Sequence, residues 1–123
     1  MPNVLIVDDS DDVRQIVGKF LQARTFFRVC GEASSGLEAI KKAEKLKPDV
    51  ILLDLKMPGM NGIETAAILK RVVPKTKLIL FSAYTESLGG TAWATAAGVD
   101  LVLSKGSLLD MADSLNNLTA DPL

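Results

Sequence analysis

Short, unbroken apolar runs that alternate with helical patterns constrain the fold of this chain more than any other feature. Four runs occupy residues 4–7, 50–53, 78–81 and 101–103, and each is followed by a polar residue or an acid. Continuous hydrophobicity of this length is typical of a strand buried on both faces of a sheet. A fifth segment, residues 27–33, is interrupted by charged residues, which indicates a strand at a sheet edge.

Helical periodicity fills the segments between these runs, with apolar residues recurring along one helix face. The four clear stripes are Val13, Ile16, Val17, Phe20 and Leu21; Leu37, Ile40, Ala43 and Leu46; Ile63, Ala66, Ala67, Leu69 and Val73; and Leu108, Met111, Ala112, Leu115 and Leu118. Residues 85–97 form the weakest candidate helix, because Gly89 and Gly90 each cost about 1 kcal/mol relative to alanine.

The alternation of strands and helices predicts an α/β fold, with a mostly parallel sheet covered by helices on both faces. The length of 123 residues suits one domain spanning residues 1–123. Ligands of such sheets bind beyond the carboxyl ends of the strands, at the point where the strand order reverses. The residues at those strand ends are therefore the ones to examine for function.

Composition excludes several classes of function. Histidine is absent, which excludes histidine-based acid–base catalysis, a phosphohistidine and histidine metal ligands. The lone cysteine, Cys30, forms neither an internal disulfide nor a zinc cluster. A net charge of −1 gives no electrostatic reason to bind nucleic acid or an anionic membrane. Because no basic targeting segment precedes the first strand and no apolar run approaches ~18 residues, we expect a cytoplasmic protein.

Polar side chains stand at the ends of four of the five strands. Asp8 and Asp9 follow the first strand, Asp54 the third and Ser82 the fourth, and Lys105 lies just beyond the fifth. If the strand order is 2-1-3-4-5, strands one and three are neighbours about 4.8 Å apart, which crowds three carboxylates together. Their mutual repulsion is strong unless a cation lies among them. A hard divalent ion with oxygen ligands, most simply Mg²⁺, would relieve it.

Each of these residues also has an ordinary structural interpretation. We assign Asp11 and Asp12 to the start of a helix, where acids favour the positive end of the helix dipole. For the acidic pair that precedes them, capping and chemistry are equal alternatives when the pair is considered alone. Asp54 could be a turn residue at the end of a strand, the Ser82 hydroxyl could cap nearby backbone groups, and Lys105 could be a solvated surface charge. Their joint position at one edge favours a shared chemical function.

Several motifs surround these residues. They are residues 5–9 (LIVDD), 47–54 (KPDVILLD) and 57–62 (MPGMNG), then Ser82-Ala83, and Gly98 followed by Ser104-Lys105. With these motifs the chain resembles the receiver domain of two-component response regulators, over essentially its whole length. The resemblance implies a flavodoxin-like (βα)5 fold, a doubly wound five-stranded parallel sheet of order 2-1-3-4-5. It also implies a phosphorylation-dependent signalling switch that catalyses its own phosphorylation and dephosphorylation without being a multiple-turnover enzyme.

The resemblance gives the strand-end residues their roles. Asp54 would accept a phosphoryl group from a histidine kinase, a phosphotransfer protein or a small phosphodonor. The expected Mg²⁺ ligands are Asp8, acting mainly through the ion's water shell, Asp9, Asp54 and the Lys56 backbone carbonyl. Ser82 and Lys105 would contact phosphoryl oxygens.

The expected output is a change in partner binding. Phosphorylation adds roughly −1.5 to −2 charge and three acceptor oxygens. These would draw Ser82 and Lys105 inward and alter the face formed by residues 85–97, strand five and the last helix. The partner would be a downstream effector protein or a C-terminal output domain missing from this chain, and a phosphorylation-dependent homodimer is a further form of output. We expect no direct binding of nucleic acid or membrane by this chain.

Two positions depart from the pattern of the family. Receivers commonly carry an aromatic residue three positions before the lysine, where this chain has Val102, so signalling through a rotating aromatic ring is in doubt. Gly106 replaces the usual proline after the lysine, and we expect a trans peptide bond there because a cis bond without proline costs ~3 kcal/mol. Lys56 and Tyr84 lie where receiver side chains flank the phosphoryl group; either they slow the approach of water or they point to solvent.

Three other functions are alternatives to this one. A flavin-binding module of similar topology would need a loop of small residues after strand one to cradle a phosphate, whereas this loop carries four acids. A phosphohydrolase with an aspartyl-phosphate would place a second aspartate where Lys56 stands. A degenerate receiver that acts only as an interaction module, independent of phosphorylation, is the remaining alternative. The presence of Asp9, Asp54 and Lys105 argues against it.

Overall fold

The structure, a computed structural model, describes residues 2–82, 97–106 and 108–119, and a five-stranded parallel sheet lies at its centre. The strands are β1 (Asn3–Val7), β2 (Arg28–Ala33), β3 (Val50–Leu53), β4 (Lys77–Ser82) and β5 (Leu101–Ser104), in the order β2-β1-β3-β4-β5. The helices are α1 (Asp11–Arg24), α2 (Gly36–Leu46), α3 (Gly62–Val72) and α5 (Leu108–Thr119). The predicted fold class and strand order are confirmed. Most of the expected helix at residues 85–97, and Tyr84 before it, lie outside the described residues.

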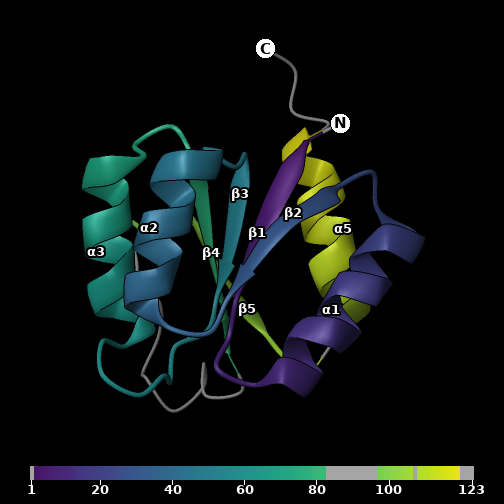
Figure 1. The fold of residues 1–123 in the computed structure, drawn as a ribbon. Helices are drawn as coiled ribbons and strands as arrows, with labels where there is room; N and C mark the ends of the chain where they lie inside the picture. The colour runs from purple at the N-terminus through teal and green to yellow at the C-terminus, as the bar shows by residue number, and fades with distance from the viewer. Residues whose placement is uncertain (1, 83–96, 107, 120–123) are drawn as a thin grey trace.

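Helices cover both faces of the sheet (Figure 1). α2 and α3 lie together on one face, and α1 and α5 lie together on the other. Successive side chains of a strand point to opposite faces, so each strand contributes to two cores. In β1, Leu5 and Val7 belong to the core beside α2 and α3, whereas Val4 and Ile6 belong to the core beside α1 and α5. Burial on both faces explains why residues 4–7 of this strand are apolar without interruption.

The two edge strands are less buried than the three central ones. The charged residues in β2 predict an edge position, which is confirmed. β5 forms the other edge, and its residues Leu101, Val102 and Leu103 are only half-buried. Val102 packs against the core beside α2 and α3, and Leu101 and Leu103 pack against the core beside α1 and α5, so this apolar run contributes to both cores but is less buried than the central strands.

The stripes of α3 and α5 are buried or half-buried throughout, whereas those of α1 and α2 include exposed residues. Ile16 and Leu37 are exposed although both belong to the expected stripes. α2 buries Ala43 of the expected stripe and, beside it, Ala39. It also comes so close to α3 that a Cβ atom at Gly36 would overlap the hydroxyl of Thr65. Close packing of α2 against α3 thus requires a residue without a Cβ atom at position 36.

Short polar side chains begin three of the helices. The side chains of Ser10, Ser35 and Asn61 each accept a backbone N–H from the first turn of α1, α2 and α3. Asp11 and Asp12 lie in the first turn of α1, as assigned from the sequence. Among the described helices, none has both the length and the apolar character that a membrane span requires.

Candidate functional site

Three aspartates meet at the carboxyl ends of β1 and β3. Because these two strands are hydrogen-bonded neighbours, Asp8, Asp9 and Asp54 lie just beyond adjacent strand ends. One carboxylate oxygen from each lies within 4.8 Å of the others. Asp8 and Asp54 are 3 % and 7 % exposed, whereas Asp9 is exposed to solvent. The crowding predicted from the strand order is confirmed.

Backbone hydrogen bonds hold two of these aspartates to the sheet. The Asp54 N–H donates to the carbonyl of Val7 at 3.0 Å, and the Asp8 N–H donates to the carbonyl of Ala33 at 3.0 Å. The Ser10 N–H donates to Asp8 Oδ1, also at 3.0 Å. The positions of Asp8 and Asp54 are thus fixed by strand pairing rather than by a free loop.

Lys105 brings a positive charge to this cluster from beyond the end of β5. Its Nζ lies 2.6 Å from Asp8 Oδ2 and 3.2 Å from Asp54 Oδ1. Burial alone would lower the pKa of Lys105, but the hydrogen bond to Asp8 and the charge of Asp54 raise it above its ordinary value. The lysine is therefore a permanent cation at neutral pH.

The pKa of Asp54 is raised above its ordinary value. Burial is the largest cause, the charge of Asp8 adds to it, and Lys105 offsets it only in part. Burial and like charge together thus outweigh the effect of Lys105 on Asp54, and further positive charge at the cluster would offset them. The donor set consists of oxygen atoms, as a hard divalent cation such as Mg²⁺ requires.

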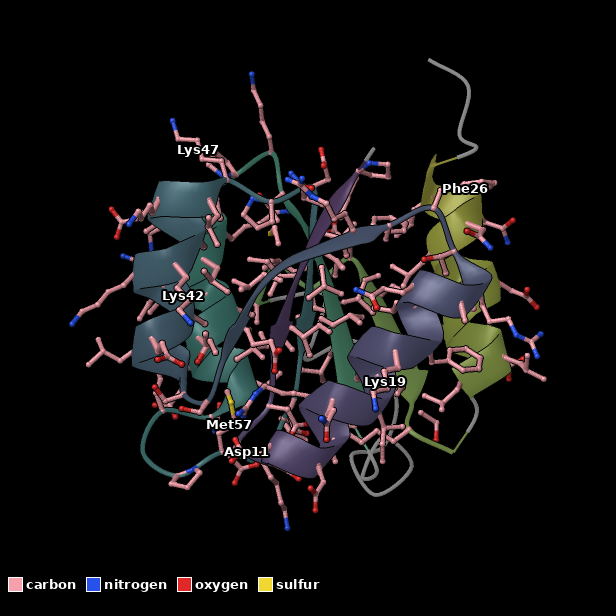
Figure 2. All side chains as sticks on the ribbon, turned by 45° about the vertical axis from the view of Figure 1, so that its right-hand side comes forward. Asp11, Lys19, Phe26, Lys42, Lys47 and Met57 are labelled. Carbon is pink, nitrogen blue, oxygen red and sulfur yellow. The ribbon has the colours of Figure 1, made fainter. Side chains whose placement is uncertain are left out.

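Two further predicted residues lie beside the cluster. Ser82 ends β4, is fully buried and pairs in register with Ser104 of β5. Lys56 is exposed and, with Asp9, Met57, Pro58 and Asn61, lines an open cavity of about 330 Å³. Figure 2 shows Met57 and Asp11 at this same end of the molecule, with Lys47 at the opposite end. A small molecule or a partner side chain can thus reach Asp9 from solvent.

Comparison with known proteins assigns the chain to a family. A family model described as the response regulator receiver domain matches residues 4–114. The chain belongs to this family. The response regulator protein VraR from Staphylococcus aureus is 39 % identical over 113 residues, covering 91 % of this chain and 54 % of the relative. This receiver domain thus spans about half the length of the curated relatives it matches.

Solved structures of receiver domains share the fold. The receiver domain of the putative response regulator NarL from Mycobacterium tuberculosis is 29 % identical, with a TM-score of 0.88 and 98 % of each chain covered. The response regulator domain of Thermotoga maritima CheB is 32 % identical, with a TM-score of 0.84 and 99 % of each chain covered. The response regulator TrrA from T. maritima, in complex with Mg²⁺-BeF, is 27 % identical, with a TM-score of 0.84, covering 96 % of this chain and 99 % of that one.

Two residues that contribute to the site of this receiver domain were missed from the sequence. Gly62, the last residue of the MPGMNG motif, lies against the backbone of Asp54, and a Cβ atom there would overlap the Asp54 carbonyl oxygen. Arg14 donates to the Asp8 carbonyl at 2.6 Å, and nothing in its helical pattern indicated this. The MPGMNG motif could have pointed to Gly62 as a site residue, whereas no sequence motif pointed to Arg14.

The structure shows the surroundings of the two positions, Val102 and Gly106, that depart from the family pattern. Val102 packs against the core on the α2–α3 face of the sheet. The peptide bond between Lys105 and Gly106 is trans, as expected in the absence of proline. Gly106 donates its N–H to Ser104 Oγ at 3.1 Å, which turns the chain after β5.

Proposed function

We propose that this receiver domain is a signalling switch that accepts a phosphoryl group on Asp54 and then changes its affinity for a partner. The proposal rests on one observation above all: three carboxylates lie within 4.8 Å of one another and the ammonium of Lys105 reaches two of them. Phosphoryl transfer needs a positioned nucleophile and positive charge around the phosphoryl oxygens, and little else from the protein. The cluster supplies both.

Asp8, Asp9, Asp54 and the backbone carbonyl of Lys56 would hold Mg²⁺. The oxygen-only donor set supports this ion, as does the raised pKa of Asp54, which reflects burial among like charges. The similar response regulator TrrA was solved with Mg²⁺-BeF, which supports the same assignment. When bound, the ion neutralises developing charge on the phosphoryl oxygens.

Asp54 acts as the nucleophile in the proposed reaction. One of its carboxylate oxygens forms a bond to phosphorus while the bond from phosphorus to the donor nitrogen or oxygen breaks, and the leaving group keeps the electron pair. Lys105, a cation held 3.2 Å from Asp54, donates to one phosphoryl oxygen of the product, and the Ser82 hydroxyl donates to another. The product is an aspartyl phosphate.

These 123 residues contain no histidine that could donate the phosphoryl group, so the donor lies outside this domain. A histidine kinase or a phosphotransfer protein is the proposed donor. The proposed receiver of the signal is an effector protein or an output domain, which the greater length of the VraR relatives supports. Homodimerisation on phosphorylation is a further form that the output can take.

Intact-mass spectrometry with acetyl phosphate tests the proposal. The wild-type chain should gain the mass of one phosphoryl group in Mg²⁺ and none after chelation by EDTA. Asp54→Asn should gain none, whereas Asp113→Asn, which removes an exposed carboxylate of α5, should react as the wild type does. A wild-type chain that gains no mass in Mg²⁺ would overturn the proposal and favour an interaction module that is independent of phosphorylation.

A further inference from the structure

Arg14 of α1 joins the loop that carries Asp8 and Asp9 to the end of the edge strand β2. Its Nη1 donates to the Asp8 carbonyl oxygen at 2.6 Å, and its Nε donates to Glu32 Oε1 at 3.0 Å. Its Nη2 pairs with Asp11 of the first turn of the same helix. Only 12 % of the Arg14 side chain is exposed. A planar guanidinium with three nitrogens engaged in this way has little freedom to move.

The end of β2, which Arg14 contacts through Glu32, is also held by hydrogen bonds to its backbone. The backbone carbonyl of Glu32 accepts a hydrogen bond from Lys42 of α2, which Figure 2 labels. The next residue, Ala33, accepts the N–H of Asp8 at 3.0 Å. The loop after β1 is therefore tied to β2 twice, once through the backbone and once through the side chain of Arg14.

The carboxylate of Asp8 has different partners from its carbonyl. Oδ1 accepts the Ser10 N–H at 3.0 Å, and Oδ2 accepts Lys105 Nζ at 2.6 Å. Arg14 holds the same residue by its backbone oxygen, on the side toward Glu32. The hydrogen bond from Arg14 to the Asp8 carbonyl fixes the peptide group between Asp8 and Asp9, and so it fixes the Cα positions from which both side chains extend.

We propose that Arg14 is a positioning residue for the metal and phosphoryl site, which it serves by fixing the Asp8 carbonyl so that the carboxylates of Asp8 and Asp9 face Asp54. This inference rests on the proposed function of the cluster. Groups that hold metal-binding residues in place commonly change metal affinity by about 10- to 100-fold when removed.

The charge of Arg14 and its hydrogen bonds have opposite effects on Mg²⁺ affinity, and this makes the inference testable. A positive charge near the carboxylates repels a cation, so removal of the charge alone would strengthen Mg²⁺ binding. Loss of a positioning contact would weaken it, because the carboxylates must then be ordered when the ion binds. The sign of the change therefore separates the two roles.

Calorimetric titration with MgCl₂, without a phosphodonor, measures this sign directly. Arg14→Gln should bind Mg²⁺ about tenfold more weakly than the wild type. Lys19→Gln is the matched control, because it removes an exposed positive charge from the same helix (Figure 2) without touching the loop. It should bind Mg²⁺ as the wild type does or slightly more tightly. An Arg14→Gln variant that binds as tightly as the wild type, or more tightly, would overturn the inference.

A double-mutant cycle with Glu32→Gln tests the route through β2. If Arg14 acts through its bond to Glu32, the double variant should bind Mg²⁺ no more weakly than Arg14→Gln alone, whereas additive losses would contradict this route. Arg14→Lys keeps the charge but replaces the planar fork of donor nitrogens by a single ammonium, so it should bind Mg²⁺ with intermediate affinity. It replaces Arg14→Gln if that variant does not fold. Urea unfolding of each variant shows whether it is folded during the titration.

The outcomes also separate this inference from the proposed function. If the wild-type chain binds no Mg²⁺, the proposed function itself is wrong. If the wild-type chain and the Arg14 variants bind Mg²⁺ equally well, only the proposed role of Arg14 is wrong.

Discussion

The ammonium of Lys105 lies closer to Asp8, at 2.6 Å, than to Asp54, at 3.2 Å. The lysine therefore bridges the aspartates that follow β1 and β3, although it comes from the far edge of the sheet. A divalent cation in the cluster would compete with this ammonium for the same carboxylate oxygens. Because of this competition, a change that removes the ammonium should lower the stability of the protein and raise its affinity for the metal.

Substitution of Lys105 should make the protein less stable and its Mg²⁺ binding tighter. Lys105→Met leaves Asp8 and Asp54 without their cation, which should lower the free energy of unfolding by about 1–3 kcal/mol in EDTA. The same change removes a repelling charge, so Mg²⁺ affinity should rise several-fold. Urea unfolding in EDTA and calorimetric titration measure the two effects. A variant that binds Mg²⁺ more weakly would contradict the competition.

Gly62 should tolerate no side chain, because of its contact with the backbone of Asp54. A Cβ atom there would overlap the Asp54 carbonyl oxygen and lie 2.9 Å from the Leu55 Cα. Gly62→Ala should therefore cost about 1–3 kcal/mol or more of unfolding free energy and slow phosphorylation by displacing Asp54.

Gly18→Ala is the matched control for Gly62→Ala. A Cβ atom at Gly18, inside α1, would meet Ile6 at an ordinary 3.7 Å. The same substitution should here stabilise the protein by about 0.5–1 kcal/mol, because alanine favours the helix. Urea unfolding of both variants checks the contrast; equal effects would show that backbone contact at Gly62 does not matter.

Glu38 should make the stability of the protein depend on pH in the acid range. The Ser34 N–H donates to Glu38 Oε1 at 2.7 Å, and this hydrogen bond lowers the pKa of Glu38. A carboxyl whose pKa is lower in the folded chain stabilises that chain above its unfolded pKa of about 4.3 and loses the contribution as the pH falls through the folded pKa.

The matched variants Glu38→Gln and Glu44→Gln isolate this contribution. Both residues lie on α2, but Glu44 is exposed and lies outside the first turn of the helix. Glu38→Gln should be less stable than the wild type at pH 7 and should match it at about pH 3. Urea unfolding at both values measures the difference, and a deficit that persists unchanged in acid would refute this assignment.

Cys30 should react slowly with thiol reagents in the folded protein. It is the chain's one cysteine, and its Sγ lies 3.4 Å from the Val4 carbonyl oxygen. Burial raises the pKa of this thiol, which reduces the fraction of reactive thiolate. Alkylation by iodoacetamide at pH 7.5 should therefore be slower in buffer than in urea, and equal rates would show that the thiol is not shielded.

The sheet and the aspartate cluster could be predicted because both follow from local patterns and one topological rule. Apolar runs show where strands lie, and parallel strands bring their carboxyl ends to one edge, so Asp8 and Asp54 had to meet once their strands were neighbours. The exposure of Ile16 and Leu37 could not be predicted in this way. Periodicity identifies a helix face but does not show how much of that face a neighbour covers.

The roles of Gly62 and Arg14 depend on distances that no sequence pattern contains. Gly62 matters because α3 begins against the backbone of Asp54, and Arg14 matters because β2 ends within reach of α1. Both contacts join segments whose separation is set by packing of the whole domain. The residues that carry the proposed chemistry were thus visible in the sequence, whereas those that hold them in place were not.

Chemical mapping of the phosphorylated residue tests the central claim most directly. Borohydride reduces an aspartyl phosphate to the corresponding alcohol, which marks the modified residue for peptide mass spectrometry. After reaction with acetyl phosphate and Mg²⁺, the account predicts the reduced residue at Asp54 alone. Label on Asp8 or Asp9, or a stable phosphate on Ser82, would contradict it.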